Sequence, residues 1–168
     1  KEIVVNYESL DDGINVAYGM KGIADCHAAN YEPERMFDGN EGNYHCAAGN
    51  HEGHYMGMDA NKVFYVKSLE IIFPDATDHK FYIDYRLEDG QWKNLDAADM
   101  KENTEAKNTF KFDVNDKLSA LLVHYNGNTT GNWPALCEMK INGFKNLSTT
   151  ENNYIEENKN VYRVIKSG

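Results

Sequence analysis

The chain has 168 residues, of which 41% are hydrophobic and 12% aromatic, so it is long enough for one folded domain and too apolar to be disordered. It carries 17 Lys and Arg residues against 27 Asp and Glu residues, which gives a formal net charge of −10. Such a charge repels polyanions on average, which argues against nucleic acid as a partner. No apolar stretch is long enough to cross a bilayer, so membrane insertion is not expected.

The chain opens with Lys-Glu rather than Met, and we expect it to be a mature or excised piece of a longer, multidomain protein. It contains three cysteines, Cys26, Cys46 and Cys137. They form no CxxC motif and are too few for a zinc ribbon, and pairing between any two of them stays open.

Hydrophobic residues alternate with period two along the middle of the chain, which is typical of β-strands. Residues 63–73 read VFYVKSLEIIF and place Leu69, Ile71 and Phe73 on one face. Residues 81–87 read FYIDYRL, and the side chains expected to face the core are Phe81, Ile83, Tyr85 and Leu87.

A tight turn is predicted at residues 88–90, because Asp-Gly supplies the positive φ that hairpins need. A return strand at 91–95 follows, and its Trp92 is predicted to be a core residue. Residues 97–107 are polar nearly all round and predict a loop with one helical turn. Further strands are predicted at 110–114, 120–125 and 137–141.

Long segments rich in Gly and Asn separate the strands, notably residues 38–61 and 126–132. Long ordered loops in a small β-domain usually carry its function. The end of the chain is polar and then closes with VYRVI, which predicts a last strand that pairs with the IVV segment at 3–5. Many short strands without βαβ alternation predict an all-β sandwich or jelly roll.

Four segments stand in a fixed order along the chain. They are residues 33–40 (PERMFDGN), 55–66 (YMGMDANKVFYV), 82–95 (YIDYRLEDGQWKNL) and 132–143 (NWPALCEMKING). In this order and at these separations they resemble the motifs of the coagulation factor 5/8 type C, or discoidin, domain, whose bacterial relatives include carbohydrate-binding module family 32. The resemblance covers roughly residues 15–144 and is closest in 82–95.

The resemblance implies an all-β, discoidin-like β-sandwich or jelly roll of the galactose-binding-domain-like kind over residues 1–144. Residues 145–168 would be a polar linker and a final strand packed on the same domain. The implied function is that of a non-catalytic carbohydrate-binding module, secreted or at the cell surface, that attaches an enzyme or the cell to an oligo- or polysaccharide.

The sequence departs from the resembled family where galactose-binding relatives contact their sugar. Asn43-Tyr44-His45 replaces Thr-x-Trp, Cys46 stands at the position of a His, and Phe73-Pro74-Asp75 lacks an Arg. The resemblance therefore implies glycan binding without implying galactose.

A structural calcium ion is also implied, because in the resembled family the Asp-Gly-Asn loop and the Glu of the last strand wrap one. A hard cation of this kind takes six or more oxygen ligands. An Asp-Gly-Asn sequence is equally what an ordinary tight turn contains. The ligands carried over are the carbonyls of Arg35 and Cys137 and the side chains of Asp38, Asn40, Asn43 and Glu138.

A second metal hypothesis comes from the residues His45, Cys46, His51 and His54, since imidazole and thiolate are the ligands that zinc prefers. A metal-dependent hydrolase that uses this loop is therefore an alternative function. The segment 51–54 is one residue short of HExxH, and its Gly-rich flanks argue against the helix that this motif needs. Polar residues on a solvated rim are the simpler interpretation.

The predicted sugar site is formed by the loops 44–54, 74–79 and 126–133 at one end of the sandwich. Sugars are held by aromatic faces and by amides, carboxylates and imidazoles that bind hydroxyl groups. Trp133 is the best aromatic platform, although a buried core position stays open for it. The predicted sugar-binding residues are Tyr44, His45, Asp75, His79, Asn126, Asn128 and Trp133.

No catalytic residues are predicted. The chain has no G-x-S-x-G elbow, and nothing selects a pair of carboxylates among its scattered acidic residues. The expectation is a binding module rather than an enzyme. A protein- or cell-adhesion module on the same fold is the first alternative, because a fold alone does not fix a ligand.

Overall fold

The computed structural model describes residues 6–9, 15–95, 108–144, 154–157 and 160–165. The loop predicted at 97–107 and the segment 3–5 lie outside these residues. Within them the chain is nearly all strand, and the one helix of the described part is the short 3₁₀ helix η1 (Pro33–Phe37). The predicted all-β sandwich is therefore confirmed.

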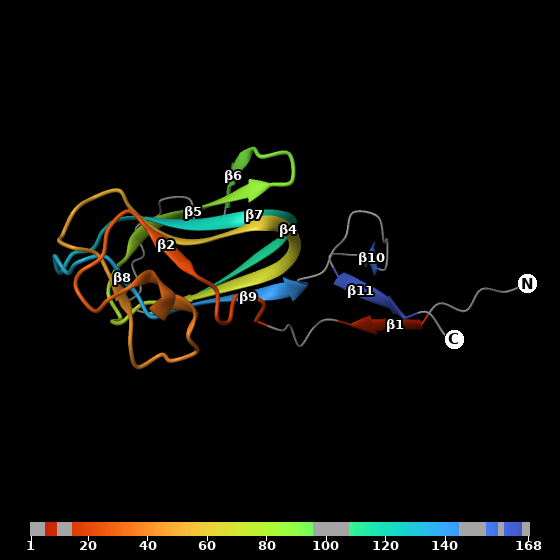
Figure 1. The fold of residues 1–168 in the computed structure, drawn as a ribbon, viewed down its shortest axis with the longest axis horizontal. Coiled ribbons are helices and arrows are strands. Elements are labelled where there is room, and N and C mark those ends of the chain that lie inside the picture. The colour runs from red at the N-terminus through yellow and green to blue at the C-terminus, as the bar shows by residue number, and fades with distance from the viewer. Residues whose placement is uncertain (1–5, 10–14, 96–107, 145–153, 158–159, 166–168) are drawn as a thin grey trace, which may run out of the picture.

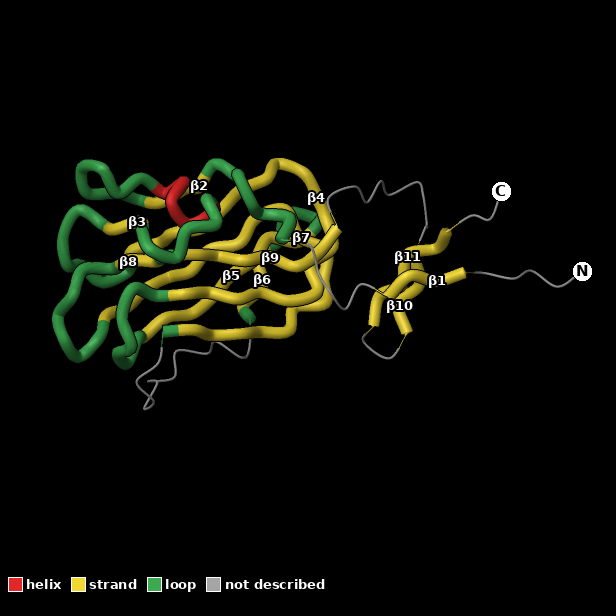
Figure 2. The backbone as a smooth tube through the Cα atoms, turned by 90° about the horizontal axis from the view of Figure 1, so that it is seen from below, coloured by secondary structure: helices red, strands yellow, loops and turns green. Residues whose placement is uncertain are grey.

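Two long strands, β4 (His54–Ile72) and β7 (Thr109–Gly127), build the sandwich. They pair antiparallel from His54↔Tyr125 to Ile72↔Thr109, with a break in register between Asp59 and Phe64. Around that break both strands curve over together, as Figures 1 and 2 show. Asn61 and Asn115 adopt positive φ values of 54° and 51° there, a conformation that Asn tolerates better than most residues. The same two strands thus contribute to both layers.

The first half of β4 and the second half of β7 form one layer, and their other halves form the opposite layer. Strand β9 (Glu138–Phe144) extends the second layer by pairing with residues 65–72 of β4. The strands that extend the first layer are β2 (Gly22–Ala24), β5 (Lys80–Leu87) and β6 (Trp92–Asn94). A separate two-stranded sheet joins β3 (His45–Cys46) to β8 (Ala135–Leu136).

The core confirms the predicted alternation in β4 and β5. Leu69, Ile71 and Phe73 are at most 1% exposed, and Ile83 is fully buried. The strand boundaries differ from the prediction, because a strand that bends between two layers carries two hydrophobic patterns joined by polar residues. The segments predicted separately at 110–114 and 120–125 are one strand, β7.

The prediction that Trp92 is a core residue is wrong, since its side chain is 48% exposed. Trp92 lies in the three-residue edge strand β6 and pairs with Arg86 of β5. Directly paired residues share one face of a sheet, and Arg86 points away from the core. The guanidinium carbon of Arg86 lies 5.8 Å from the Trp92 ring centroid, so this tryptophan packs against a cation on the surface.

A three-stranded sheet joins the two ends of the chain, with the strand order β1 (Asn6–Ser9), β11 (Asn160–Ile165), β10 (Tyr154–Glu157). The predicted last strand therefore exists and pairs with a strand near the N-terminus, from Asn6↔Ile165 to Ser9↔Tyr162. The division into 1–144 and 145–168, with the tail packed on the same domain, stays a prediction. No helix in the described part of the chain is long and apolar enough to span a bilayer.

Candidate functional site

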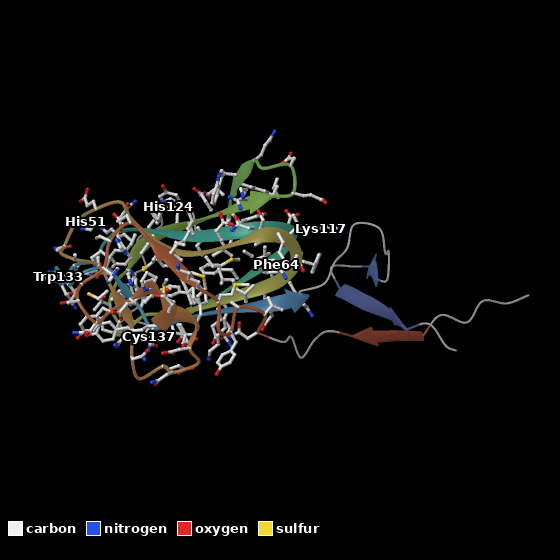
Figure 3. All side chains as sticks on the ribbon, viewed as in Figure 1. His51, Phe64, Lys117, His124, Trp133 and Cys137 are labelled. Atoms are coloured by element: carbon white, nitrogen blue, oxygen red, sulfur yellow. The ribbon has the colours of Figure 1, made fainter. Side chains whose placement is uncertain are left out.

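A cleft of about 340 Å³ opens at the end of the sandwich where the long loops meet. Figure 3 shows Trp133 at this end, opposite Phe64 and Lys117, where β4 and β7 curve over. The residues that line the cleft are Tyr44, Cys46, Pro74, Asp75, His79, Tyr125, Asn128, Asn132, Trp133 and Ala135. The three predicted loops thus do converge on one hollow.

Five of the predicted sugar-binding residues line this cleft, namely Tyr44, Asp75, His79, Asn128 and Trp133. The structure does not bring His45 and Asn126 into its lining. Successive side chains in a strand point to opposite faces, and in β3 it is Cys46 that faces the cleft, whereas His45 is fully buried. Burial lowers the pKa of His45 to about 4.

The rim of the cleft is aromatic. The sequence left two positions open for Trp133, an exposed platform and a buried core residue. Its side chain is 51% exposed, so it is not a core residue. Tyr44 is half-buried, and its ring centroid lies 5.0 Å from that of Tyr31. Exposed rings beside a hollow provide the apolar faces against which the C–H surface of a sugar packs.

The floor of the cleft is a chain of hydrogen bonds. A carbonyl oxygen only accepts, so His79 donates its Nε2–H to the Asp75 carbonyl at 3.1 Å, and its Nδ1 accepts from the Tyr125 hydroxyl at 3.0 Å. The Tyr125 oxygen in turn accepts from Asn128 Nδ2 at 2.7 Å. Burial lowers the pKa of His79 and raises that of Tyr125 to about 12.

The roles of His79 and Asn128 are therefore mainly internal. Besides Tyr125, Asn128 bonds to the backbone oxygen and nitrogen of Asn132 and accepts from the Thr130 hydroxyl. The His79 ring stacks on Phe73 with 3.8 Å between centroids. These bonds show that both residues shape the cleft from below, and their role as sugar ligands stays a prediction.

Hydrogen bonds between polar residues at the rim join the loop at 74–79 to the loop at 126–133. Asn132 donates its Nδ2 to Asp75 Oδ2 at 2.7 Å, and Asp78 accepts from the Thr129 backbone N–H at 3.1 Å. Sequence reasoning missed Asn132, although it lies inside the loop expected at 126–133. It also missed Tyr125, because the alternation that places this residue in the core says nothing of where its hydroxyl points.

The DGN loop (residues 38–43) meets β9 at Glu138. The backbone N–H of Asn40 donates both to Asp38 Oδ1 at 2.8 Å and to Glu138 Oε1 at 3.0 Å. Asn43 donates its Nδ2 to Asp38 Oδ2 at 2.8 Å. The structure thus brings the side chains of Asp38, Asn43 and Glu138 together around the backbone of Asn40, whose own Oδ1 accepts from the Gly42 backbone N–H at 2.9 Å. The other two predicted ligands are carbonyls at Arg35 in η1, which packs against β9, and at Cys137, which precedes β9.

Two oxygens of this cluster, Asn43 Oδ1 and Glu138 Oε2, are buried without a hydrogen-bond partner among the described residues. Glu138 is fully buried. Its burial is the main reason that its pKa is raised to about 7, and the neighbouring carboxylate of Asp38 is the second reason. A buried acceptor that lacks a partner is destabilising, and Ca²⁺ binds carboxylate and amide oxygens of this kind. The residues present therefore fit a calcium ion.

The zinc ligand set predicted from the histidine loop does not form as expected. Cys46 lines the cleft, and His45 Nδ1 bonds to the Tyr31 carbonyl at 2.9 Å. The two remaining residues, His51 and His54, lie against side chains from another loop instead.

A sequence model described as the F5/8 type C domain matches residues 23–160. The chain belongs to this family. The predicted recognition of a discoidin-like domain is confirmed, and the match includes both the DGN loop and the segments that line the cleft. No curated protein sequence matches the chain.

Several solved structures share the fold of this F5/8 type C domain. The module CpGH89CBM32-4 of Clostridium perfringens, in complex with GlcNAc-α-1,4-galactose, is 19% identical with a TM-score of 0.69, over 81% of this chain and 94% of that one. Chitosan-binding module 1 of a chitosanase/glucanase from Paenibacillus sp. IK-5 is 16% identical with a TM-score of 0.66, over 77% and 99%. The CBM32 of AlyQ, bound to 4,5-unsaturated mannuronic acid, is 18% identical with a TM-score of 0.60, over 74% and 95%.

Proposed function

We propose that this domain is a non-catalytic carbohydrate-binding module whose ligand occupies the cleft beneath Trp133. The observation that carries the proposal is a half-exposed tryptophan beside a hollow whose floor is already fully hydrogen-bonded. Such a floor holds the rim in place, and a ring fixed in advance loses little entropy when a sugar packs on it. The carbohydrate-binding modules of the same fold support this function.

The charge of the cleft indicates the class of sugar. Among the described residues that line it there is no Lys or Arg, and Asp75 places a carboxylate at the rim. A uronic acid would meet that carboxylate and the net charge of −10 without a cation to pair with. Neutral sugars and amino sugars avoid this repulsion. The proposed ligands therefore resemble the GlcNAc-α-1,4-galactose of the Clostridium module and the chitosan of the Paenibacillus module rather than the mannuronic acid bound to AlyQ.

A structural calcium ion is part of the proposal. Asp38, Asn40, Asn43 and Glu138 would hold it, with the carbonyls of Arg35 and Cys137 completing the oxygen ligands. The support is the pair of buried oxygens without a partner, on Asn43 and Glu138. An ion there would join the DGN loop to β9 and hold this end of the sandwich together.

The proposed context is a longer protein outside the cell, in which this module keeps an attached enzyme or the cell close to a polysaccharide. A shallow cleft with one principal aromatic ring offers few contacts, so the affinity of a single module would be modest. Neighbouring modules in the same protein would raise the overall affinity through avidity.

The test is a glycan array, followed by calorimetric titration with the best neutral oligosaccharide, a chitosan oligomer and a uronate oligomer. We expect the first two to bind and the uronate to bind at least tenfold more weakly. Trp133→Ala should weaken binding by about 10–30-fold, equivalent to about 1.4–2 kcal/mol. Trp92→Ala is the matched control, since Trp92 is as exposed as Trp133 but lies on β6, away from the cleft lining.

Selective binding that Trp133→Ala removes and Trp92→Ala preserves would establish the function. Silence across the array would overturn it and favour a protein- or cell-adhesion module. Equal effects of the two tryptophan substitutions would show that sugars bind the chain without using the cleft.

A further inference from the structure

A cluster of four metal-ligating side chains lies outside the cleft and outside the DGN loop. Its members are Asp25, Cys26, His51 and His54, whose ligand atoms all lie within 4.8 Å of one another. The cluster joins two segments far apart in the sequence. Asp25 and Cys26 follow β2, and the backbone N–H of Asp25 is held by the Tyr55 carbonyl at 3.2 Å, next to His54 at the start of β4.

The hydrogen bonds behind the cluster determine which nitrogen of His54 faces it without a proton. The Tyr31 carbonyl can only accept, so His45 Nδ1, 2.9 Å away, carries its proton. His45 is fully buried and therefore neutral, since an unpaired buried charge is strongly disfavoured. Its Nε2 is then an acceptor, and His54 Nε2, 3.0 Å away, must be the donor.

A neutral His54 that donates from Nε2 has a bare lone pair on Nδ1. That nitrogen contacts Asp25 Oδ1 and lies 3.9 Å from Cys26 Sγ. A lone pair directed at a carboxylate is repulsive unless a positive species lies between them, here between the buried His54 and the exposed Asp25. In its neutral form the fully buried His54 thus directs an unprotonated nitrogen toward three other ligand atoms.

We propose that Asp25, Cys26, His51 and His54 bind a zinc ion. Zinc is four-coordinate with imidazole, thiolate and carboxylate ligands, and bonds of the usual length set the ligand atoms about 3.3–3.6 Å apart in a tetrahedron. The Cys26 sulfur lies 3.8 Å from His51 Nε2, and Asp25 Oδ2 lies 3.1 Å from the same nitrogen. Shifts of a few tenths of an ångström would bring these two distances to the tetrahedral spacing, and the widest separation within the cluster, at most 4.8 Å, would close by roughly an ångström.

The surroundings of His54 match those of a metal ligand. A zinc-bound histidine usually donates its other ring N–H to an acceptor that fixes its orientation. Here His54 donates to His45, which in turn donates to the Tyr31 carbonyl. His45 is thus a positioning residue for the zinc site rather than a sugar ligand.

Four protein ligands leave no open position for water or substrate, so the zinc is structural. It would join the segment after β2 to the loop that precedes β4. His51 belongs to that loop, and Figure 3 shows it at the same end of the molecule as Trp133. This role is independent of sugar binding. A hydrolytic metal site on the histidine loop would need a vacant ligand position, which this ligand set does not leave.

The test uses the full chain, stripped of metals and titrated with Zn²⁺ and, separately, with Co²⁺. We expect one zinc ion per chain, a higher melting temperature with zinc, and a Co²⁺ spectrum with tetrahedral ligand-field bands and a thiolate charge-transfer band. Cys26→Ser should abolish the charge-transfer band, and both Cys26→Ser and His51→Ala should weaken zinc binding at least tenfold. Both residues are only half-buried, so these variants should fold.

The control is His27→Ala, which removes an exposed imidazole next to Cys26 that is not a member of the cluster. It should leave zinc affinity unchanged. His45→Gln tests the positioning role and should weaken zinc binding by about 10–100-fold, while Cys26 still gives the charge-transfer band. Asp38→Ala should leave zinc affinity unchanged, which separates this site from the DGN loop.

The proposal is overturned if the metal-free chain binds no zinc, or if Cys26→Ser and His51→Ala bind it as tightly as the parent. In the first case a proton on His54 Nδ1, paired with Asp25, would be the positive species between the two groups.

Discussion

Two polar clusters underlie the loops of this domain, and they differ in how completely they are hydrogen-bonded. The floor of the cleft, formed by His79, Tyr125 and Asn128, matches each donor to an acceptor within the chain. The DGN loop leaves Asn43 Oδ1 and Glu138 Oε2 buried without a partner among the described residues. A closed network of this kind needs no ion from solution, whereas unpartnered buried oxygens indicate where a cation would bind. The two clusters should therefore respond differently to calcium.

The largest expected effect is on the DGN loop. Asp38→Ala removes a carboxylate that bonds to both Asn40 and Asn43, so the variant should lose the stabilisation that calcium gives. A ligand at 100 times its dissociation constant stabilises by about 2.7 kcal/mol, which for a domain of this size raises the melting temperature by roughly 5–10 °C. Thermal unfolding of metal-free protein, with and without added Ca²⁺, measures that difference directly.

The control for Asp38→Ala is Asp89→Ala, which removes an Asp side chain that bonds to the backbone in a distant hairpin turn. That variant should respond to calcium as the parent does. A parent whose melting curve is the same with and without calcium would contradict the calcium proposal.

The second effect is on the floor and should be independent of calcium. Tyr125→Phe removes the hydroxyl that accepts from Asn128 and donates to His79, and leaves a buried His79 nitrogen without a partner. A loss of about 1–3 kcal/mol in the free energy of unfolding is expected. Urea denaturation with and without Ca²⁺ should give the same difference from the parent in both conditions.

Tyr18→Phe is the control for the Tyr125 substitution, because Tyr18 is 63% exposed. It should change the free energy of unfolding by less than about 0.5 kcal/mol. If the loss caused by Tyr125→Phe changed with calcium, the two clusters would be coupled, and the floor could not be regarded as a closed unit.

The sequence predicted the DGN cluster better than it predicted the floor of the cleft. The Asp-Gly-Asn motif and Glu138 pointed to the DGN cluster, because the family resemblance pairs two segments about a hundred residues apart. The floor had no such signal, since Tyr125 follows the ordinary alternation of a core strand. Trp92 and His45 were misplaced for a related reason. Whether a residue on a short strand points in or out depends on its partner strand, which periodicity over two or three residues does not reveal.

The same limit explains the zinc cluster. The histidine loop was visible in the sequence, but two of the four ligands come from Asp25 and Cys26, which follow β2. Their proximity to His54 depends on the antiparallel pairing of β2 with β4, in which Ala24 lies opposite Met56. Counting the spacing of His and Cys within one loop therefore found two members of the cluster, His51 and His54, and two residues that lie outside it, His45 and Cys46.

The smallest effect concerns the pH response of the floor. Burial lowers the pKa of His79 below its ordinary value of 6.5, although Asp75 and Asp78 partly oppose that shift. The folded state therefore takes up a proton on His79 less readily than the unfolded state does. Its contribution to stability is complete above about pH 6.5 and is lost as the pH falls from there toward the folded pKa. A protonated Nδ1 could no longer accept the hydrogen bond from the Tyr125 hydroxyl. The other ring nitrogen, Nε2, could not replace it as acceptor, because it donates to the Asp75 carbonyl.

His79→Gln tests this response because it removes the titrating group and retains hydrogen-bonding capacity. Melting temperatures of metal-free parent and variant between pH 7.5 and pH 5 should converge as the pH falls, since only the parent loses the His79 contribution. Other histidines with lowered pKa values, among them the half-buried His124, affect both proteins alike. Parallel curves would mean that His79 takes up its proton equally in the folded and unfolded states. The closed network of the floor would then be less rigid than its hydrogen bonds imply, and its distinction from the DGN loop would rest on calcium alone.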